Sequence, residues 1–207
     1  MKKLKATDLL AEELAEEGIR KISGVQGGAV VHIFDSIHEK TNIDVVYTHH
    51  EQSAALAANA YSKRNNGIGV CVVTTGPATT NAMTGLLAAW QDSTAVIYIS
   101  GQTRKEQTSY GKGLRQVGSQ ECNILDVVKP WCKYTKLVDD VKQIEETIRE
   151  AIIVSKEGRP GPVWIDIPVN IQWQEVERSE TIFTKVKESK DMSNEMRELM
   201  ESIEKAE

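Results

Sequence analysis

Aromatic and cysteine residues are scarce in this chain of 207 residues. Aromatic side chains make up 5% of the sequence, and the three cysteines are Cys71, Cys122 and Cys132. They form no CxxC pair and no even set for disulfides, so the sequence predicts free thiols in a reducing compartment, the cytoplasm. The same spacing excludes a zinc site built from CxxC pairs.

An excess of positive charge is also absent. Lys and Arg number 25 against 30 Asp and Glu, for a net charge of −5, which excludes the broad basic surface typical of nucleic-acid binding. No apolar run approaches the roughly 20 residues that span a bilayer. The basic residues 2–5 precede an acidic amphipathic segment and not the apolar core of a signal peptide. We therefore expect neither a nucleic acid nor a membrane as a partner.

Short apolar runs alternate with helical patterns along most of the chain. Strand-like runs at residues 21–25, 43–47, 69–74, 95–100 and 163–167 are separated by segments in which apolar residues recur at helical spacing. Continuous apolar runs are typical of parallel strands that are covered on both faces. The alternation therefore predicts an α/β fold, a doubly wound and mainly parallel sheet flanked by helices on both faces.

Caps and composition predict where this domain begins and ends. Thr7 is expected to cap the first helix and Gly18 to end it. Beyond the last apolar run the composition becomes charged, and residues 174–195 are expected to form a linker. The chain is thus divided into a domain of residues 1–172 and a segment of residues 173–207, which holds the linker and the start of a helix of a further domain.

Three of the predicted strands lead into polar or glycine-rich loops, at residues 24–28, 49–51 and 74–81. The first lacks the GxGxxG spacing of a dinucleotide site and is better explained as a tight turn. For Glu51, two interpretations stay open. It can stabilise the start of a helix through the helix dipole, or pass a proton to a buried heterocycle where the small residues 54–58 allow another chain to pack closely.

Five segments occur in an order and spacing typical of one enzyme superfamily. They are Gly24-Val25-Gln26-Gly27-Gly28, His50-Glu51-Gln52-Ser53-Ala54, Thr75-Gly76-Pro77-Ala78-Thr79-Thr80-Asn81, residues 95–102 and residues 158–168. Together they resemble the N-terminal pyrimidine-binding (PYR) domain of thiamine-diphosphate enzymes, most of all the large-subunit type of acetolactate synthase. The resemblance covers about residues 4–172 and implies the fold of that domain.

The resemblance implies a role for particular residues. Glu51 corresponds to the family glutamate that hydrogen-bonds N1′ of the aminopyrimidine and so promotes removal of the thiazolium C2 proton, which makes it the expected catalytic residue. Gly76, Pro77 and Asn81 correspond to the loop that flanks the pyrimidine. The residues expected at the substrate site are Gly28, Ala29, Gln120 and Lys133. The implied reaction is decarboxylation of a small 2-keto acid followed by carboligation.

Two departures from the family pattern bear on the substrate. Ala78 and Thr79 replace a Gly and an Ala of the usual Gly-Pro-Gly-Ala-Thr-Asn loop. Residues 103–118 are longer than in acetolactate synthases and lack the usual Val-Pro-Arg-Arg after Gln102. Because that segment shapes substrate access and flavin packing in the family, acetolactate formation and FAD binding both stay open, as does a different keto acid or a sugar-like substrate.

The Gly-Asp-Gly segment that holds the diphosphate and Mg²⁺ in the family does not occur in this sequence. We therefore expect no metal ligand in this chain, which would hold only the pyrimidine half of thiamine diphosphate and be inactive alone. In a homodimer or tetramer, the diphosphate-binding (PP) domain of another subunit would complete the site. A piece of a longer enzyme is the favoured interpretation, with a natural split subunit of a 2-keto acid decarboxylase and a non-catalytic dimerisation module as alternatives.

Overall fold

Six parallel strands form the central sheet of the structure, a computed structural model that describes residues 3–178 and 193–204. Their order across the sheet is β3-β2-β4-β5-β7-β6, and every pairing within it is parallel. The strands are β2 (Lys21–Gly24), β3 (Asp44–Tyr47), β4 (Gly69–Val73), β5 (Val96–Gln102), β6 (Tyr134–Leu137) and β7 (Val163–Pro168). The predicted doubly wound α/β fold is confirmed.

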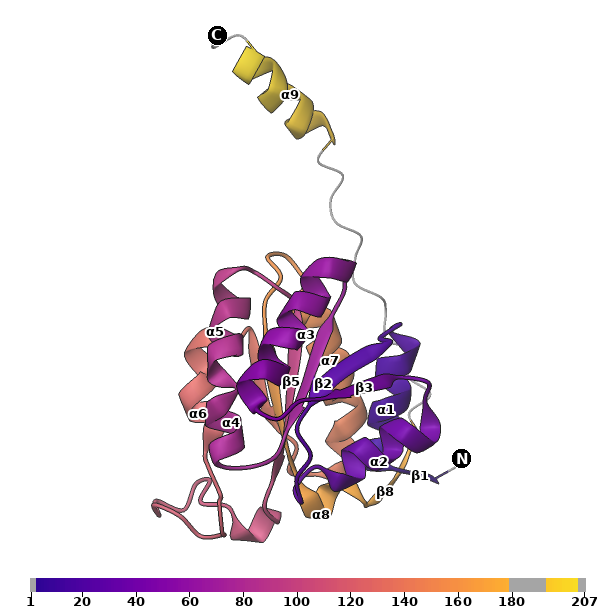
Figure 1. Cartoon of the computed structure of the whole chain (residues 1–207), viewed down its shortest axis with the longest axis vertical. Helices are drawn as coiled ribbons and strands as arrows, with labels where there is room; N and C mark the ends of the chain where they lie inside the picture. Colours follow the sequence, from indigo (N-terminus) through magenta and orange to yellow (C-terminus); the bar gives the residue numbers. More distant parts are fainter. Residues whose placement is uncertain (1–2, 179–192, 205–207) are drawn as a thin grey trace.

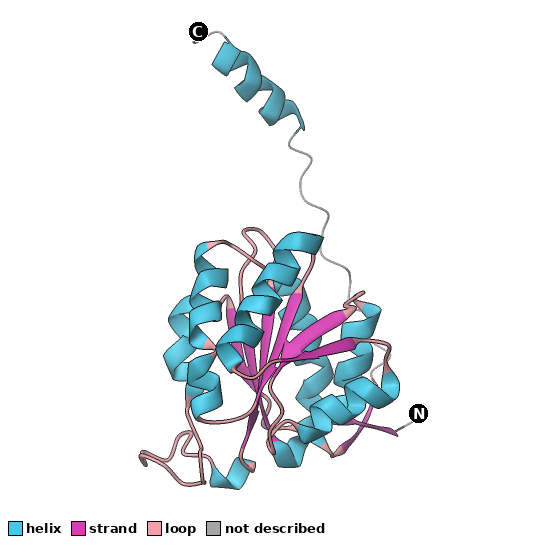
Figure 2. Ribbon diagram, viewed as in Figure 1, coloured by secondary structure: helices cyan, strands magenta, loops and turns pink. Residues whose placement is uncertain are grey.

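Helices cover both faces of this sheet, as Figure 1 and Figure 2 show. α1, α2 and α7 pack on one face, and α3, α5 and α6 pack on the other. The described helices are α1 (Ala6–Glu16), α2 (Val31–Lys40), α3 (Glu51–Asn65), α4 (Pro77–Asn81), α5 (Met83–Gln91), α6 (Ile124–Val128), α7 (Ile144–Lys156), α8 (Val169–Gln172) and α9 (Ser193–Glu204). Across the described parts of the chain, none of them combines the length and the apolar character needed to cross a membrane.

Alternate side chains of the central strands enter two different hydrophobic cores. Val70 and Val72 of β4 join the core under α1, α2 and α7, whereas Cys71 and Val73 join the core under α3, α5 and α6. β4, β5 and β7 are buried along their whole length, while most of the edge strand β3 is exposed. Strands that face a core on both sides are mostly apolar, which is why these runs were visible in the sequence.

Successive strands of the chain lie on opposite sides of β2 in the sheet. The chain passes from β2 outward to the edge strand β3 and then returns to β4, on the other side of β2. Ligands of doubly wound sheets bind at such a switch point, outside the carboxyl ends of the strands. The loops that follow β2, β3 and β4 are therefore the ones in which a functional site is expected.

The first helix begins earlier than predicted. Lys5 precedes α1 without a side-chain capping bond, and Thr7 is the second residue of the helix. The prediction that Thr7 caps this helix is wrong, because its buried hydroxyl donates to the carbonyl of Gln172 at 3.1 Å. Gly18 follows the helix as predicted, with a φ of +92° that favours glycine.

Part of the expected linker is folded. β8 (Glu175–Glu177) pairs antiparallel with β1 (Lys3–Lys5), so the prediction of a linker from residue 174 onward is wrong for these residues. Pairing with a distant strand supplies the backbone hydrogen bonds that a charged composition does not reveal. Residues 179–192 lie outside the described residues, and the division of the chain at residue 172 stays a prediction.

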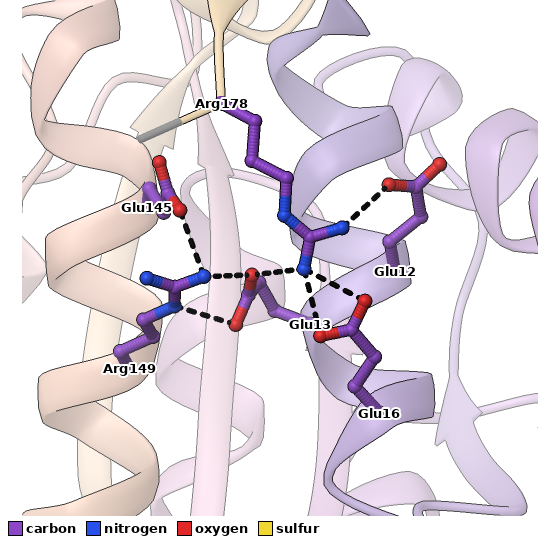
Figure 3. A network of polar contacts seen from close by, with 6 residues as sticks. All are labelled: Glu12, Glu13, Glu16, Glu145, Arg149 and Arg178. Atoms are coloured by element: carbon purple, nitrogen blue, oxygen red, sulfur yellow. Dashed lines mark hydrogen bonds and ion pairs between the residues drawn. The ribbon is translucent and has the colours of Figure 1, made fainter. Parts of the chain in front are cut away.

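A charged network fastens the end of this segment to two helices (Figure 3). Arg149 of α7 donates to both carboxylate oxygens of Glu13 of α1, at 2.8 and 2.7 Å, and lies 2.8 Å from Glu145. Arg178, the residue after β8, lies 2.9 Å from Glu13 and 2.7 Å from Glu16. We call this the Glu13 network; its members are Glu12, Glu13, Glu16, Glu145, Arg149 and Arg178.

Candidate functional site

The loops after β2, β3 and β4 carry most of the residues that the sequence singled out. Each of these residues follows the carboxyl end of its strand, so they share one edge of the sheet at the switch point. They are Gly28 and Ala29 after β2, Glu51 after β3, and Gly76, Pro77 and Asn81 after β4. The candidate site is therefore assembled from three separate parts of the chain.

Glu51 and Asn81 are joined by a hydrogen bond between two of these loops. The side-chain amide of Asn81 donates to Oε2 of Glu51 at 2.9 Å. His50 adopts extended backbone, and its Nδ1 accepts from the backbone N–H of Gln52 at 3.1 Å, so α3 begins at Glu51. Glu51 is half-buried, and its second carboxylate oxygen remains available to a ligand.

Gly76 makes the turn that leads into α4. Its φ of +68° favours glycine, and a Cβ at this position would lie 2.3 Å from the carbonyl oxygen of Gln120. Pro77 then starts α4, where its fixed φ suits the first helical turn. The departure at Thr79 leaves this turn intact, because the Thr79 hydroxyl donates to the carbonyl of Gly76 at 2.6 Å.

The loop after β2 packs against the loop after β4. A Cβ on Gly27 would lie 2.5 Å from the Cβ of Thr74, and the N–H of Ala29 donates to the Thr74 hydroxyl at 3.4 Å. The position of a Cβ on Gly28 is open, with no atom within 4 Å. A cavity of about 470 Å³ adjoins it, lined by Gln26, Gly27, Gly28, Val31, Phe34, Asp35 and His38.

The structure brings Gln120 to the site but not Lys133. The carbonyl of Gln120 faces Gly76 and lies 3.2 Å from the Thr75 hydroxyl. Lys133 lies just before β6, at the opposite edge of the sheet, and its ammonium donates to the carbonyls of Val154 and Glu157 at the end of α7. Burial lowers the pKa of Lys133.

Sequence reasoning missed a buried carboxyl group beside the site. Asp166 of β7 is completely buried. Its Oδ1 accepts from the Ser100 hydroxyl at 2.6 Å, and its Oδ2 accepts from the Gln102 amide at 3.0 Å and from the Tyr110 hydroxyl at 3.3 Å. The available signal was an acidic residue inside the apolar run of residues 163–167, since a carboxyl group there must find hydrogen-bond donors.

Gln102 connects this carboxyl group to the loop after β4. Its amide nitrogen also donates to the carbonyl of Cys122 at 2.8 Å, and its amide oxygen accepts from the Thr75 hydroxyl at 2.8 Å. The side chain of Gln102 is thereby fully hydrogen-bonded and buried. We call Ser100, Gln102, Tyr110 and Asp166 the Asp166 network.

Burial dominates the electrostatics of these groups. Burial raises the pKa of Asp166 to about 7, although the hydrogen bonds from Ser100, Gln102 and Tyr110 lower it in part. Burial also raises the pKa of the Cys71 thiol, and the charge of Glu51 adds to this effect. Both changes keep the neutral forms of these groups populated at higher pH than in water.

Potential metal ligands do not cluster in the described residues. Within residues 3–178 and 193–204, no group of three or more His, Cys, Asp and Glu side chains is arranged to hold a metal ion. Besides Glu51 and Asn81, the loops at the strand ends carry the polar side chains of His50, Thr74 and Thr75.

Comparison with known proteins accounts for this arrangement. Residues 4–127 match the family model described as thiamine pyrophosphate enzyme, N-terminal TPP binding domain. The chain belongs to this family. The match contains all three loops of the TPP-binding domain, from Gly28 to Asn81, together with Gln120.

Curated relatives of this TPP-binding domain are acetolactate synthases. The large subunit from Haemophilus influenzae is 36% identical over 171 residues, which cover 81% of this chain and 28% of that protein. Isozyme 3 from Escherichia coli is 33% identical over 83% of this chain and 29% of its own large subunit. Acetolactate synthase 2, chloroplastic, from Nicotiana tabacum is 36% identical over 82% of this chain and 25% of its own length. The chain thus spans less than a third of these relatives.

The residues at the strand ends fit the aminopyrimidine half of thiamine diphosphate. The Asn81 amide donates to one carboxylate oxygen of Glu51 at 2.9 Å, and the other oxygen would be the acceptor for a ring N–H. The position of a Cβ on Gly28 is open, whereas a Cβ on Gly76 would collide with the carbonyl of Gln120. Glu51 and Asn81 thus supply the polar contacts that a ring nitrogen would need.

Proposed function

We propose that this chain binds the aminopyrimidine of thiamine diphosphate as part of an acetolactate synthase-like enzyme that acts on a small 2-keto acid. The observation that supports this most strongly is the bond between Glu51 and Asn81 at the switch point, in a chain that belongs to the TPP-binding family. Gly76, Pro77 and Asn81 would hold the ring, and Gly28, Ala29 and Gln120 would face the substrate.

Glu51 acts on a proton in this proposal. Its free oxygen would accept a hydrogen bond from N1′ of the ring and hold that nitrogen in its protonated form, while Asn81 keeps the carboxylate from turning away. When bound, thiamine diphosphate supplies carbanion stabilisation next to a carbonyl, the chemistry of decarboxylation and carboligation. The protein's part in this proposal is to orient that chemistry.

In this proposal, the site for Mg²⁺ and the diphosphate lies outside this chain. Mg²⁺ and the diphosphate would be held by the PP domain of another subunit in a homodimer or tetramer. The chain covers 28% of its Haemophilus influenzae relative, which leaves ample length for such a domain there. The free thiols of Cys71, Cys122 and Cys132 support a cytoplasmic location. FAD is left out of the proposal because residues 103–118 depart from the family pattern.

A reconstitution experiment tests this function. The chain is assayed with thiamine diphosphate, Mg²⁺ and a panel of 2-keto acids, first alone and then joined to a PP domain of an acetolactate synthase. We expect no decarboxylation by the chain alone and measurable turnover after the PP domain is added. Turnover by the chain alone, or no turnover by a folded complex with any keto acid, would contradict the proposal.

A further inference from the structure

The 103–122 segment is fastened at both of its ends beside the Gly76 turn. At its start, the backbone N–H of Thr103 donates to the amide oxygen of Gln102 at 3.0 Å. At its end, the carbonyl of Cys122 accepts from the Gln102 amide nitrogen at 2.8 Å, and the carbonyl of Gln120 packs on Gly76. One buried side chain, Gln102, therefore closes the segment into a loop.

Glu121 organises the middle of the segment. Its carboxylate accepts from the backbone N–H of Ser109 at 2.6 Å and from that of Val117 at 2.8 Å, and it also contacts the Ser109 hydroxyl. These hydrogen bonds help to lower the pKa of Glu121 against the opposing effect of burial. This clasp joins two parts of the segment to each other and not to the sheet.

Tyr110 is the side chain that joins the middle of the segment to the sheet through Asp166. Residues 111–117 are exposed, whereas Tyr110 is partly buried and its hydroxyl reaches Oδ2 of Asp166 at 3.3 Å. This contact is the longest of the three hydrogen bonds that Asp166 accepts from side chains; the bond from Ser100 is 2.6 Å long. Among these three it is therefore the bond most easily lost.

We propose that the Asp166 carboxylate is a latch that holds the 103–122 segment against the Gly76 turn through Tyr110 and Gln102, and that protonation of this carboxylate releases the Tyr110 contact. This inference goes beyond the proposed function, because it concerns contacts within the chain and requires no cofactor.

Charge explains why the ionised form is the one that holds. A carboxylate accepts bonds from all three donors, and charge-assisted bonds are roughly twice as strong as neutral ones. A protonated carboxyl group carries one O–H that must itself donate, whereas Oδ1 already accepts from one neighbour and Oδ2 from two. The burial that raises the pKa of Asp166 to about 7 brings this change into the neutral range.

The other titratable groups around Asp166 do not account for a change of charge near pH 7. The titratable neighbours are the Tyr110 hydroxyl and the Cys122 thiol, and burial together with the charge of Asp166 raises the pKa of both. Glu121 acts on Cys122 from within the segment. From β5 and β7, the facing groups are the neutral side chains of Ser100, Gln102 and Trp164. Asp166 is thus the group that changes charge near pH 7.

Hydrogen exchange of the segment tests the latch. Amide exchange of residues 103–118 is measured in the whole chain from pH 5.5 to 8.5, after correction for intrinsic rates, for the unmodified chain and for Tyr110→Phe. We expect the protection of these amides in the unmodified chain to rise about threefold to tenfold as Asp166 ionises. This factor corresponds to the gain of one charge-assisted hydrogen bond. In Tyr110→Phe, which keeps the ring, we expect low protection and no such step.

Three further variants separate the latch from general loosening. Asp166→Asn is expected to abolish the pH-dependent rise in protection. If this buried variant does not fold, Tyr110→Phe tests the same contact. Glu121→Gln removes the other clasp and is expected to lower protection at every pH while the step remains. Tyr134→Phe, a tyrosine on β6, is the matched control. A flat pH profile in the unmodified chain, or a step that survives in Tyr110→Phe, would overturn the proposal.

Discussion

Glu13 and Asp166 are two carboxyl groups that this domain shields from water in opposite ways. Glu13, with 7% of its side chain exposed, is held by the guanidinium groups of Arg149 and Arg178. Asp166 is completely buried and receives bonds from neutral donors only. The first arrangement keeps the carboxylate charged because a cation compensates it, whereas the second leaves the cost of burying a charge partly uncompensated.

The two networks also lie in different parts of the fold. The Glu13 network joins α1, α7 and the residue after β8 (Figure 3). β8 is the strand that pairs with β1. The Asp166 network lies among the ends of β5 and β7 and reaches Thr75, next to the Gly76 turn. The first network pairs its buried carboxylate with cations, whereas the second holds, beside the candidate site, a carboxyl group whose pKa burial raises to about 7.

Breaking the Glu13 network should have the largest effect on stability. Arg149→Met removes the guanidinium that donates to both oxygens of Glu13 and lies 2.8 Å from Glu145, whose side chain is 6% exposed. We expect a loss of about 3 to 5 kcal/mol in the free energy of unfolding, as for other broken buried ion pairs. Urea unfolding at pH 7 measures it, with exposed Arg20→Met as the control. A loss equal to that of the control would mean that water already compensates these charges.

Asp166→Asn should change the pH dependence of stability. The pKa of Asp166 is about 7 in the folded state and roughly 3.9 in an unfolded chain. Between these values the folded state binds the extra proton, so the contribution of Asp166 to stability is greatest below pH 4 and falls as the pH rises to 7. The slope is at most about 1.4 kcal/mol per pH unit.

The measurement is the difference in unfolding free energy between the unmodified chain and Asp166→Asn from pH 4 to 9. This difference should decline from pH 4 to about 7 and then become constant, because other groups titrate alike in both proteins. Parallel curves for the two proteins across the whole range would show that burial does not shift the titration of Asp166.

Arg178, at the more exposed end of the Glu13 network, should contribute least to the free energy of unfolding. Arg178 has 33% of its side chain exposed, and ion pairs with that exposure are worth about 0.2 to 1 kcal/mol. Arg178→Met is therefore expected to cost less than about 1 kcal/mol, and added salt should shrink this cost. Urea unfolding at low and high salt checks it; an effect that equals that of Arg149→Met and is insensitive to salt would contradict the ranking.

The central sheet could be predicted from the sequence because β4, β5 and β7 are buried on both faces, and strands in that environment are mostly apolar. β8 could not, because Glu175–Glu177 is charged and its strand exists through pairing with Lys3–Lys5, far away in the chain. Thr7 was misread for a similar reason. Its partner, the carbonyl of Gln172, becomes a neighbour only in the folded state.

The candidate site shows the same difference between residues in local sequence patterns and contacts between distant segments. Glu51, Gly76 and Asn81 stand in short local patterns, and family resemblance was enough to select them. The bond between Glu51 and Asn81 was not predicted, nor was Asp166, whose side-chain partners come from β5 and from the loop that follows it. Lys133 was selected by resemblance alone, and the structure places it beside the end of α7.

Replacement of Glu51 is the most direct test of the proposed function. The rate of keto-acid decarboxylation is measured at saturating thiamine diphosphate, with the chain joined to a PP domain, for Glu51→Gln and for Glu39→Gln, an exposed glutamate of α2. Glutamine preserves the shape but carries no charge to hold the ring proton. We predict a fall of about 10²- to 10⁴-fold for Glu51→Gln, the usual contribution of a proton-transfer group, and no change for Glu39→Gln. Equal rates for the two variants would contradict the account.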